Sequence, residues 1–231
     1  SSSLGYYVFD DPVFDHTYNE FYKNSTIVSR AAAYAAKKGM IVTNSAGNEG
    51  DGGWKYIIFP ADCDSVCSVG ATDKDGNLAS FSSRGYNGKL KPNIVSVGAT
   101  TAIYAFYGLS YGDGTSYSNP NINGLIACLW QAFPEMNNMD ILKAVYKSSD
   151  RYDTPDNKYG YGEPDMKKAY RKLMKKRNEN KYGNDWLFVT EKKNNLLAVK
   201  LIGRKDGNAT LNLVNEDGEI QSTIQLITEE E

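Results

Sequence analysis

The sequence is poor in the residues that build metal centres and disulfide frameworks. It has one histidine, His16, and three cysteines among its 231 residues. Cys63 and Cys67 are four positions apart, but a zinc site needs two further thiols or imidazoles, which one histidine cannot supply. The odd cysteine count argues against a disulfide-built fold, although a local Cys63–Cys67 bridge stays open in an oxidising compartment. We expect Cys67 to begin a core strand and Cys128 to be a buried apolar residue.

Long hydrophobic runs and a strong charge of either sign are also missing. No apolar run approaches the roughly 18 residues that a membrane-spanning helix needs, so we expect no membrane span. The formal net charge is −2, which gives no reason to expect nucleic acid or an anionic membrane surface as a partner. Hydrophobic residues make up 41% and charged residues 23% of the chain, and this composition favours a sizeable folded core over disorder.

Helical and strand-like stretches alternate through most of the chain. An alanine-rich stretch with an apolar stripe, residues 27–38, predicts a helix that ends at Gly39. Apolar runs at residues 40–45, 66–72 and 91–98 predict buried strands, and a glycine- and tyrosine-rich stretch at 104–114 predicts a loop. Further helices are predicted at 122–133, 139–148 (N-cap Asn138) and 163–176. Helices that alternate with continuous apolar strands are typical of a parallel α/β sheet.

The composition changes after about residue 184. Four short apolar runs follow, at residues 186–189, 196–202, 209–214 and 220–227. Turn-forming stretches at 206–208 and 216–218 separate the last three of them. Such a pattern predicts strands joined by hairpin turns. We therefore expect an α/β domain over residues 1–180, a linker over 175–182, and a small β-rich module over 185–231 with an incomplete sheet.

A glycine-rich turn, residues 112–120 (Gly-Asp-Gly-Thr-Ser-Tyr-Ser-Asn-Pro), precedes the apolar run at 122–133. Ser116 is expected where this turn becomes a helix, among unpaired backbone N–H groups and at the positive end of the helix dipole. A serine in that place is suited to be a nucleophile whose product is an oxyanion. The same turn also suits a simple helix N-cap at Thr115 or Ser116, and by itself it does not separate the two interpretations.

A second stretch, residues 41–50, is β-rich and ends in Ala-Gly-Asn-Glu-Gly. This ending and the later Gly-Thr-Ser-x-Ser-x-Pro turn, in this order, resemble the subtilisin-like serine proteases (peptidase family S8). Further segments are similar to the family: residues 3–5 (Ser-Leu-Gly), 59–61 (Phe-Pro-Ala), 69–71 (Val-Gly-Ala), 80–85 (Ser-Phe-Ser-Ser-Arg-Gly) and 159–162 (Tyr-Gly-Tyr-Gly). The resemblance covers roughly residues 1–175 and implies a three-layer α/β fold with a mostly parallel sheet, of which this chain holds a part, followed by the small C-terminal β module.

The resemblance implies that Ser116 is the nucleophile of peptide-bond hydrolysis through an acyl-enzyme. The side-chain amide of Asn48 and the Ser116 backbone N–H are the expected donors to the oxyanion. The resemblance implies that one set of residues pairs with an extended substrate and flanks its first pocket: Ser3, Leu4, Gly5, Ser45, Ala46 and Gly47. It also implies that Glu49 lies at the pocket rim, where we expect it to tolerate basic side chains. Here the first pocket is the one that takes the side chain just before the scissile bond. Because its walls are backbone and small residues, we expect it to accept large apolar side chains.

The family's catalytic aspartate and histidine precede the Ser-Leu-Gly segment, and neither motif lies in this sequence. His16 follows that segment, so we expect it to order its loop or to lie on the surface. We therefore expect the chain to be a fragment or a processed part of a longer protease, inactive alone, with the missing N-terminal segment as its partner.

An esterase and a peptide-binding protein are the alternatives to a protease. An esterase of the Gly-x-Ser-x-Gly type is excluded, because residues 114–118 read Gly-Thr-Ser-Tyr-Ser. A non-catalytic, protease-like protein that binds extended peptides stays open, although Ser116 and Asn48 favour the protease because binding alone needs neither.

The resemblance also implies peptide or protein substrates, a secreted, periplasmic or cell-surface location, and no required cofactor. Carboxylates gather in the loop over residues 5–25, and such clusters bind hard cations through oxygen ligands. A structural calcium ion is therefore left open, but we favour a solvated loop packed with aromatic side chains.

Overall fold

The structure, a computed structural model, describes residues 1–182, 189–193, 196–200, 209–214 and 220–226. The chain divides into two compact units, Ser1–Ala169 and Tyr170–Glu231. Within these described residues, no helix combines the length and the apolar character that a membrane span requires. The first unit carries every residue that the sequence predicts for the site.

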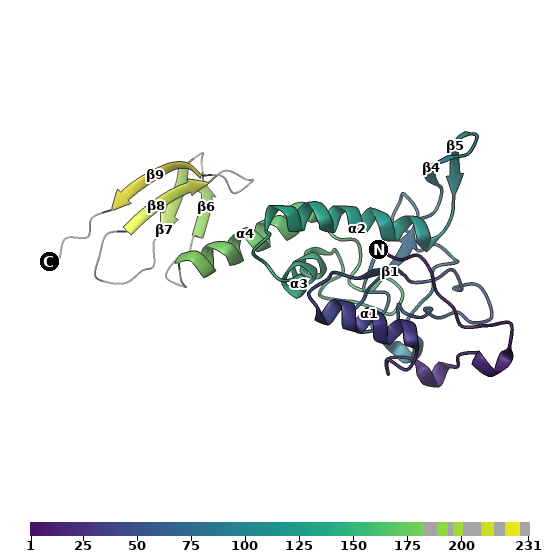
Figure 1. The fold of residues 1–231 in the computed structure, drawn as a ribbon. Helices are drawn as coiled ribbons and strands as arrows, with labels where there is room; N and C mark the ends of the chain where they lie inside the picture. Colours follow the sequence, from purple (N-terminus) through teal and green to yellow (C-terminus); the bar gives the residue numbers. More distant parts are fainter. Residues whose placement is uncertain (183–188, 194–195, 201–208, 215–219, 227–231) are drawn as a thin grey trace. The chain divides into compact units, whose positions relative to one another are not determined.

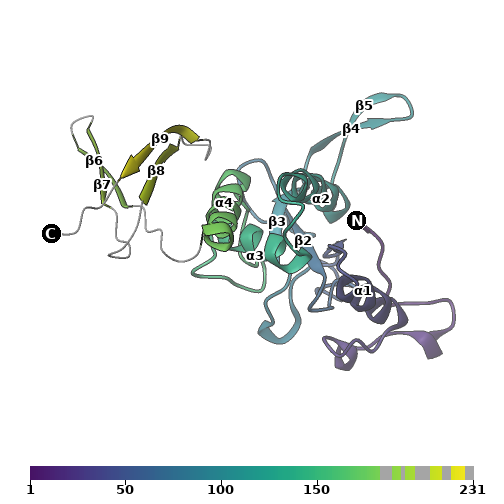
Figure 2. The ribbon, with the colours of Figure 1, turned by 60° about the vertical axis from the view of Figure 1, so that its left-hand side comes forward.

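A parallel three-stranded sheet lies at the centre of the first unit. Its order is β1 (Thr43–Ser45), β2 (Cys67–Thr72) and β3 (Ile94–Val97). Every residue of β2 is buried, as expected for a central strand covered on both faces. Helix α2 (Thr115–Ala132) lies across one face of the sheet and helix α1 (Ile27–Lys37) covers the other (Figures 1 and 2). This layered arrangement confirms the predicted α/β fold class.

Helix α3 (Asn138–Ser148) begins one residue earlier than the sequence predicts. Its N-cap is Asn137, whose side chain accepts a hydrogen bond from Asp140 N at 2.9 Å. The Asn138 side chain, predicted as the cap, instead donates from Nδ2 to the carbonyls of Ala36 at 2.8 Å and Met40 at 2.9 Å. These bonds connect the start of α3 to the end of α1 and to the residues that follow it.

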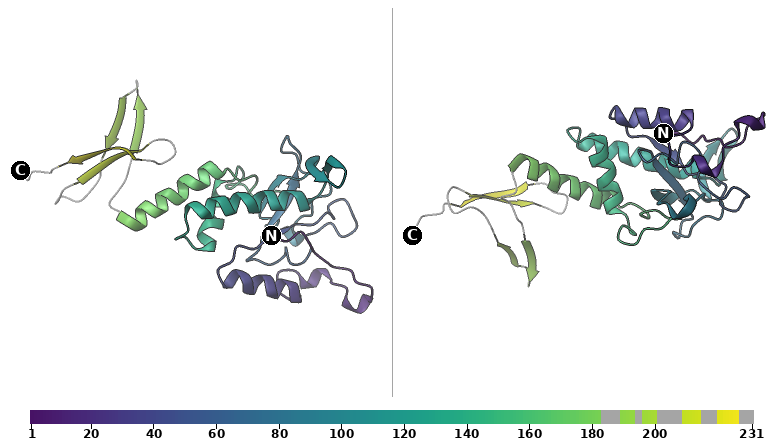
Figure 3. Two further views of the ribbon diagram at one scale, coloured as in Figure 1. Left: turned by 45° about the horizontal axis from the view of Figure 1, so that its top comes forward. Right: turned by 90° about the horizontal axis from the view of Figure 1, so that it is seen from below.

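Helix α4 (Met166–Tyr182) is longer than predicted. Residues 175–182, which the composition predicts as a linker, form its last turns, and Figure 3 shows α4 as one continuous helix. The stretch contains no proline or glycine before residue 183 and is rich in lysine, a good helix former. The stretch predicted as a linker is therefore helical, and the predicted domain limits at 180 and 185 stay a prediction.

A β-hairpin replaces the loop predicted at residues 104–114. Strand β4 (Thr101–Ala105) pairs antiparallel with β5 (Gly108–Gly112), and the hairpin projects from the unit (Figure 2). Its exposed large side chains are Tyr104, Phe106, Tyr107, Leu109 and Tyr111. Because neither face of this hairpin is covered like a core strand, the sequence lacks the alternation that identifies a strand.

The second unit contains two antiparallel strand pairs besides the end of α4. Strand β6 (Val189–Lys193) pairs with β7 (Leu196–Lys200), and β8 (Ala209–Val214) pairs with β9 (Ile220–Leu226). The three apolar runs from residue 196 onward match β7, β8 and β9. Strand β6 begins at residue 189, the last residue of the predicted run 186–189. Residues 183–188 and both predicted turns, 206–208 and 216–218, lie outside the described residues.

The cysteines differ in exposure. Cys63 and Cys67 are buried, free thiols, whereas Cys128 is exposed on α2. The expectation of a buried Cys128 was wrong because the apolar run has a helical period: Ile122, Ile126 and Leu129 form the buried face, and residue 128 falls on the outer side.

This difference predicts the order in which the thiols react. Iodoacetamide should modify Cys128 in the native protein within minutes, whereas Cys63 and Cys67 should react only after denaturation. Burial raises the pKa of the Cys67 thiol to about 11, which leaves little of the reactive thiolate. Peptide mapping by mass spectrometry gives the labelled positions, and a Cys128→Ser variant is the control that should lose the fast reaction. Fast native labelling of Cys63 or Cys67 would contradict the packing described here.

Candidate active site

Ser116 is the second residue of α2, at the junction of turn and helix that the sequence predicts. The turn is held in place by a hydrogen bond from Gly114 N to Gly98 O at 2.8 Å, and by one from Thr100 N to Asp113 Oδ1 at 2.6 Å. Ser116 itself is half-buried, so its hydroxyl group can be reached from solvent. Its backbone N–H belongs to the first turn of the helix, where no intrahelical acceptor exists.

Asn48 follows the carboxyl end of β1 and is bonded to the start of α2. Its Oδ1 accepts two hydrogen bonds, from Thr115 N and from Thr115 Oγ1, each at 2.9 Å. The first N–H of α2 is therefore capped by a side chain from a distant segment instead of by its own N-cap residue, Gly114, which has no side chain. Since the oxygen end of the Asn48 amide is occupied twice, the amide orientation is defined and Nδ2 is left to donate elsewhere.

Two N–H donors converge beside Gly114. A Cβ atom placed on Gly114 would lie 3.4 Å from Asn48 Nδ2 and 3.7 Å from Ser116 N. Neither donor has a hydrogen-bond partner among the residues that the structure describes. Because residue 114 is glycine, this space stays open, and an anionic oxygen there could accept from both donors. The structure thus brings Ser116 and Asn48 together as the sequence analysis expects.

The Ser-Leu-Gly segment is fixed beside the nucleophile by residues that the sequence analysis missed. Asn119, one turn after Ser116, donates from Nδ2 to Ser2 O at 2.7 Å, and Ser3 Oγ donates to Ser116 O at 3.4 Å. On its other side, Ser2 pairs in parallel with Asn44 of β1. Asn119 is wholly buried, and only its position one helical turn from the predicted nucleophile could have indicated its role.

The backbone of residues 46–47 is already paired within the protein. Ala46 N donates to Val69 O at 2.9 Å, and Gly47 O accepts from Ser83 N at 3.0 Å. Gly47 N donates to Thr115 Oγ1 at 3.2 Å. This segment can therefore serve as a wall of the site, whereas pairing with an extended substrate is left to residues 3–5.

Glu49 is held by an aromatic residue from the 5–25 loop. Tyr7 OH donates to Glu49 Oε2 at 2.8 Å, and the Tyr7 ring stacks on Trp54 with centroids 4.3 Å apart. Burial, together with the bond to Glu49, raises the pKa of Tyr7 to about 12, so the phenol keeps its proton at neutral pH. Tyr7 and Trp54 thus hold the carboxylate in one orientation.

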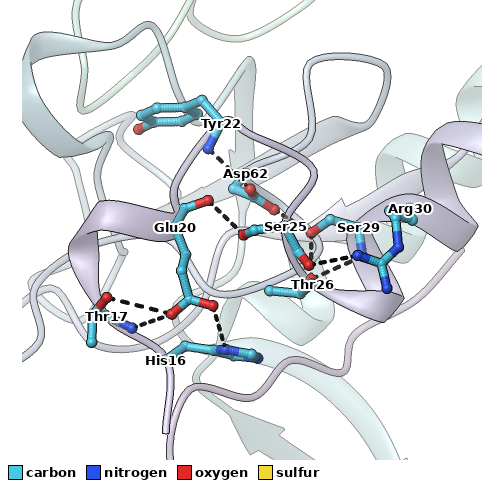
Figure 4. Close-up of polar contacts among 9 residues, drawn as sticks. All are labelled: His16, Thr17, Glu20, Tyr22, Ser25, Thr26, Ser29, Arg30 and Asp62. Carbon is cyan, nitrogen blue, oxygen red and sulfur yellow. Dashed lines mark hydrogen bonds and ion pairs between the residues drawn. The ribbon is translucent and has the colours of Figure 1, made fainter. Parts of the chain in front are cut away.

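His16 lies in the 5–25 loop, in contact with its own neighbours (Figure 4). Its Nδ1 is 3.1 Å from Glu20 Oε1, and its ring packs edge-on against Phe9 and Phe59. None of these contacts reaches the Ser116 turn. The Glu20 carboxylate also accepts from Thr17 N at 2.6 Å. His16 therefore orders its loop, as the sequence analysis expects.

The same loop is attached to α1 through a buried carboxylate. Asp62, wholly buried, accepts from Ser29 Oγ at 2.6 Å and from Tyr22 N at 3.1 Å (Figure 4). Burial raises the pKa of Asp62.

Over the part of the chain that the structure describes, no three His, Cys, Asp or Glu residues are grouped to hold a metal ion. The acidic residues of the loop act locally; for example, Asp11 accepts from Val13 N.

Comparisons with known proteins point to one family. The model of the Subtilase family (Peptidase_S8) matches residues 1–162. Subtilisin DY from Bacillus licheniformis is 35% identical over 113 residues, which are 48% of this chain and 40% of that protein. A thermophilic serine proteinase from Bacillus sp. (strain AK1) is 33% identical over 141 residues, which are 60% of this chain and 33% of that protein.

A solved structure supports the fold. The epidermin leader peptide processing serine protease from Staphylococcus aureus superposes with a TM-score of 0.54 at 24% identity, over 62% of this chain and 43% of that chain. The chain thus spans less than half the length of each of these three proteins.

Proposed function

The chain belongs to the subtilase family, and on this premise we propose that it is part of a serine endopeptidase. It supplies the nucleophile Ser116, the oxyanion donors and the substrate-binding segment of residues 3–5. The observation that carries the proposal is the convergence of Asn48 Nδ2 and Ser116 N on the open space at Gly114. Two unpartnered donors beside a reachable hydroxyl suit acyl transfer, whereas peptide binding alone needs no such arrangement.

The proposed reaction has two halves. Ser116 Oγ attacks the carbonyl carbon of the scissile peptide bond while a base takes the hydroxyl proton, and the carbonyl oxygen becomes an oxyanion bound by Asn48 Nδ2 and Ser116 N. The C–N bond then breaks, and the base passes its proton to the departing amine. In the second half, water attacks the ester with the same assistance, which releases the acid product and restores Ser116.

The base is not found beside Ser116. Among the described residues, no side chain accepts a hydrogen bond from Ser116 Oγ, and His16 is bonded to Glu20 instead. We propose that the aspartate and histidine come from a segment outside these 231 residues and that the chain alone is inactive. The proposal also includes peptides or proteins as substrates and a secreted, periplasmic or cell-surface location. It requires no cofactor for the chemistry and leaves a structural calcium ion open.

A fluorophosphonate probe tests this proposal, because it reacts with activated serines. The complete gene product should be labelled at Ser116 and should cleave an unfolded protein such as casein. The 231-residue chain should be labelled at least about 10³-fold more slowly, since it lacks the base. Equal labelling of both proteins would refute the inactivity of the chain. A complete product that binds extended peptides but is neither labelled nor proteolytic would instead support the non-catalytic alternative.

A further inference from the structure

A third segment, residues 56–59, lies between the two segments that flank the first pocket. Ile58 N donates to Ala46 O at 3.0 Å, so this segment is hydrogen-bonded beside the 45–47 wall. On its other side, Phe59 forms an antiparallel bridge with Tyr6, next to the Ser-Leu-Gly segment. Residue 58 is therefore enclosed by residues 3–6 on one side and 45–47 on the other.

The Ile58 side chain fills the space between the two pocket walls. A Cβ atom placed on Gly5 would overlap Ile58 Cδ1 and Cγ1, and one placed on Gly47 would lie 3.1 Å from Ile58 Cγ2. Gly47 also has a φ of +111°, a conformation that side chains disfavour. Both walls are therefore bare backbone where Ile58 touches them.

The direction of Ile58 follows from strand alternation. Its neighbours Ile57 and Phe59 are wholly buried, in a core cluster with Phe21 and Ala61. Successive side chains of extended backbone point to opposite sides, so Ile58 points away from this core. It is only half-buried, which means that its side chain reaches the surface within the slot instead of lying beneath it.

We propose that Ile58 forms the floor of the first pocket and restricts it to small side chains such as alanine, serine and glycine. This proposal deepens the proposed protease function and rests on it. A larger substrate side chain would need the volume that Ile58 occupies against Gly5 and Gly47, and a close-packed site accepts added carbon atoms poorly. The proposal thereby departs from the sequence-based expectation of large apolar side chains, which considered the walls without the floor.

The test compares cleavage of peptide p-nitroanilides that differ only in the residue before the scissile bond. With the complete gene product, kcat/KM for alanine should exceed that for phenylalanine by at least about tenfold, a discrimination that pocket volume commonly achieves. Ile58→Gly should enlarge the pocket and shift the alanine-to-phenylalanine ratio toward phenylalanine by about 100-fold. Ile58→Ala should shift it in the same direction by less, and it serves if the glycine variant does not fold.

Ile57→Val is the matched control, because it trims the neighbouring isoleucine on the core side and should leave the ratio unchanged. A wild-type preference for phenylalanine or leucine, or a ratio that neither Ile58 variant moves, would overturn the pocket assignment while leaving the protease intact. If the complete product hydrolyses none of the peptides and Ser116 resists the fluorophosphonate, the proposed function fails and this inference fails with it.

Discussion

Replacing Ser116 by alanine in the complete gene product is expected to abolish peptidase activity. We expect kcat to fall by about 10⁶-fold, the size of effect produced by removing the nucleophile of a subtilisin. The neighbouring threonine and serine hydroxyls at the start of α2 are engaged, because Thr115 Oγ1 donates to Asn48 Oδ1 and Ser118 Oγ donates to Thr115 O. Fluorophosphonate labelling should disappear together with hydrolysis, and the unfolding temperature should change little because Ser116 Oγ has no hydrogen-bond partner among the described residues.

Ser118→Ala is the matched control for this variant. Ser118 lies two residues along the same helix and is wholly buried, and its Oγ donates to Thr115 O at 3.0 Å. It cannot reach a substrate, so the change should cost about 1 kcal/mol of stability through a lost hydrogen bond and should preserve labelling at Ser116. If the Ser116→Ala enzyme stayed active, or if activity were lost only in Ser118→Ala, a different nucleophile would have to be found.

Replacing Asn48 by aspartate is expected to lower kcat by about 10²–10³-fold or more, with a small effect on KM. Aspartate keeps an Oδ1 that can accept from Thr115 N and Thr115 Oγ1, so the capping contact survives. It lacks the Nδ2 donor and places a negative charge beside the developing oxyanion. The loss should therefore fall on the transition state and not on substrate binding.

Asn48→Leu separates catalysis from capping. Leucine removes both the donor and the acceptor, so it should lower kcat and also destabilise the start of α2 by about 1 kcal/mol, as the loss of a helix cap does. Steady-state kinetics and thermal unfolding of both variants distinguish the two contributions. An Asn48→Asp enzyme with the wild-type kcat would show that the amide is not an oxyanion donor.

These predictions depend on how the fold gathers distant segments. Residues 3–5 and Asn48 meet at one edge of the sheet, since Ser2 forms a parallel bridge with Asn44 of β1 and Asn48 follows the carboxyl end of β1. The start of α2 reaches the same edge through the bonds between Thr115 and Asn48. Functional sites of parallel α/β sheets commonly form at this edge, because loops from several strands meet there.

Local signals in the sequence were sufficient for the elements that carry the chemistry. The alanine-rich run with Gly39 after it predicts α1, the continuous apolar run at 66–72 predicts β2, and the glycine turn predicts that Ser116 begins a helix. Each of these depends on residues within one or two turns of chain, where propensity, capping and turn chemistry act directly. The order of the motifs along the chain is sufficient to indicate the family.

Contacts between segments far apart in the chain decided the rest. The exposure of Cys128 depends on which face of α2 meets the sheet, and the role of Asn119 depends on the backbone of Ser2, more than 100 residues earlier. The floor of the first pocket is the clearest case, because Ile58 has no local feature that sets it apart from Ile57. Only the approach of Gly5 and Gly47 to either side of Ile58 makes one isoleucine part of the site and leaves the other in the core.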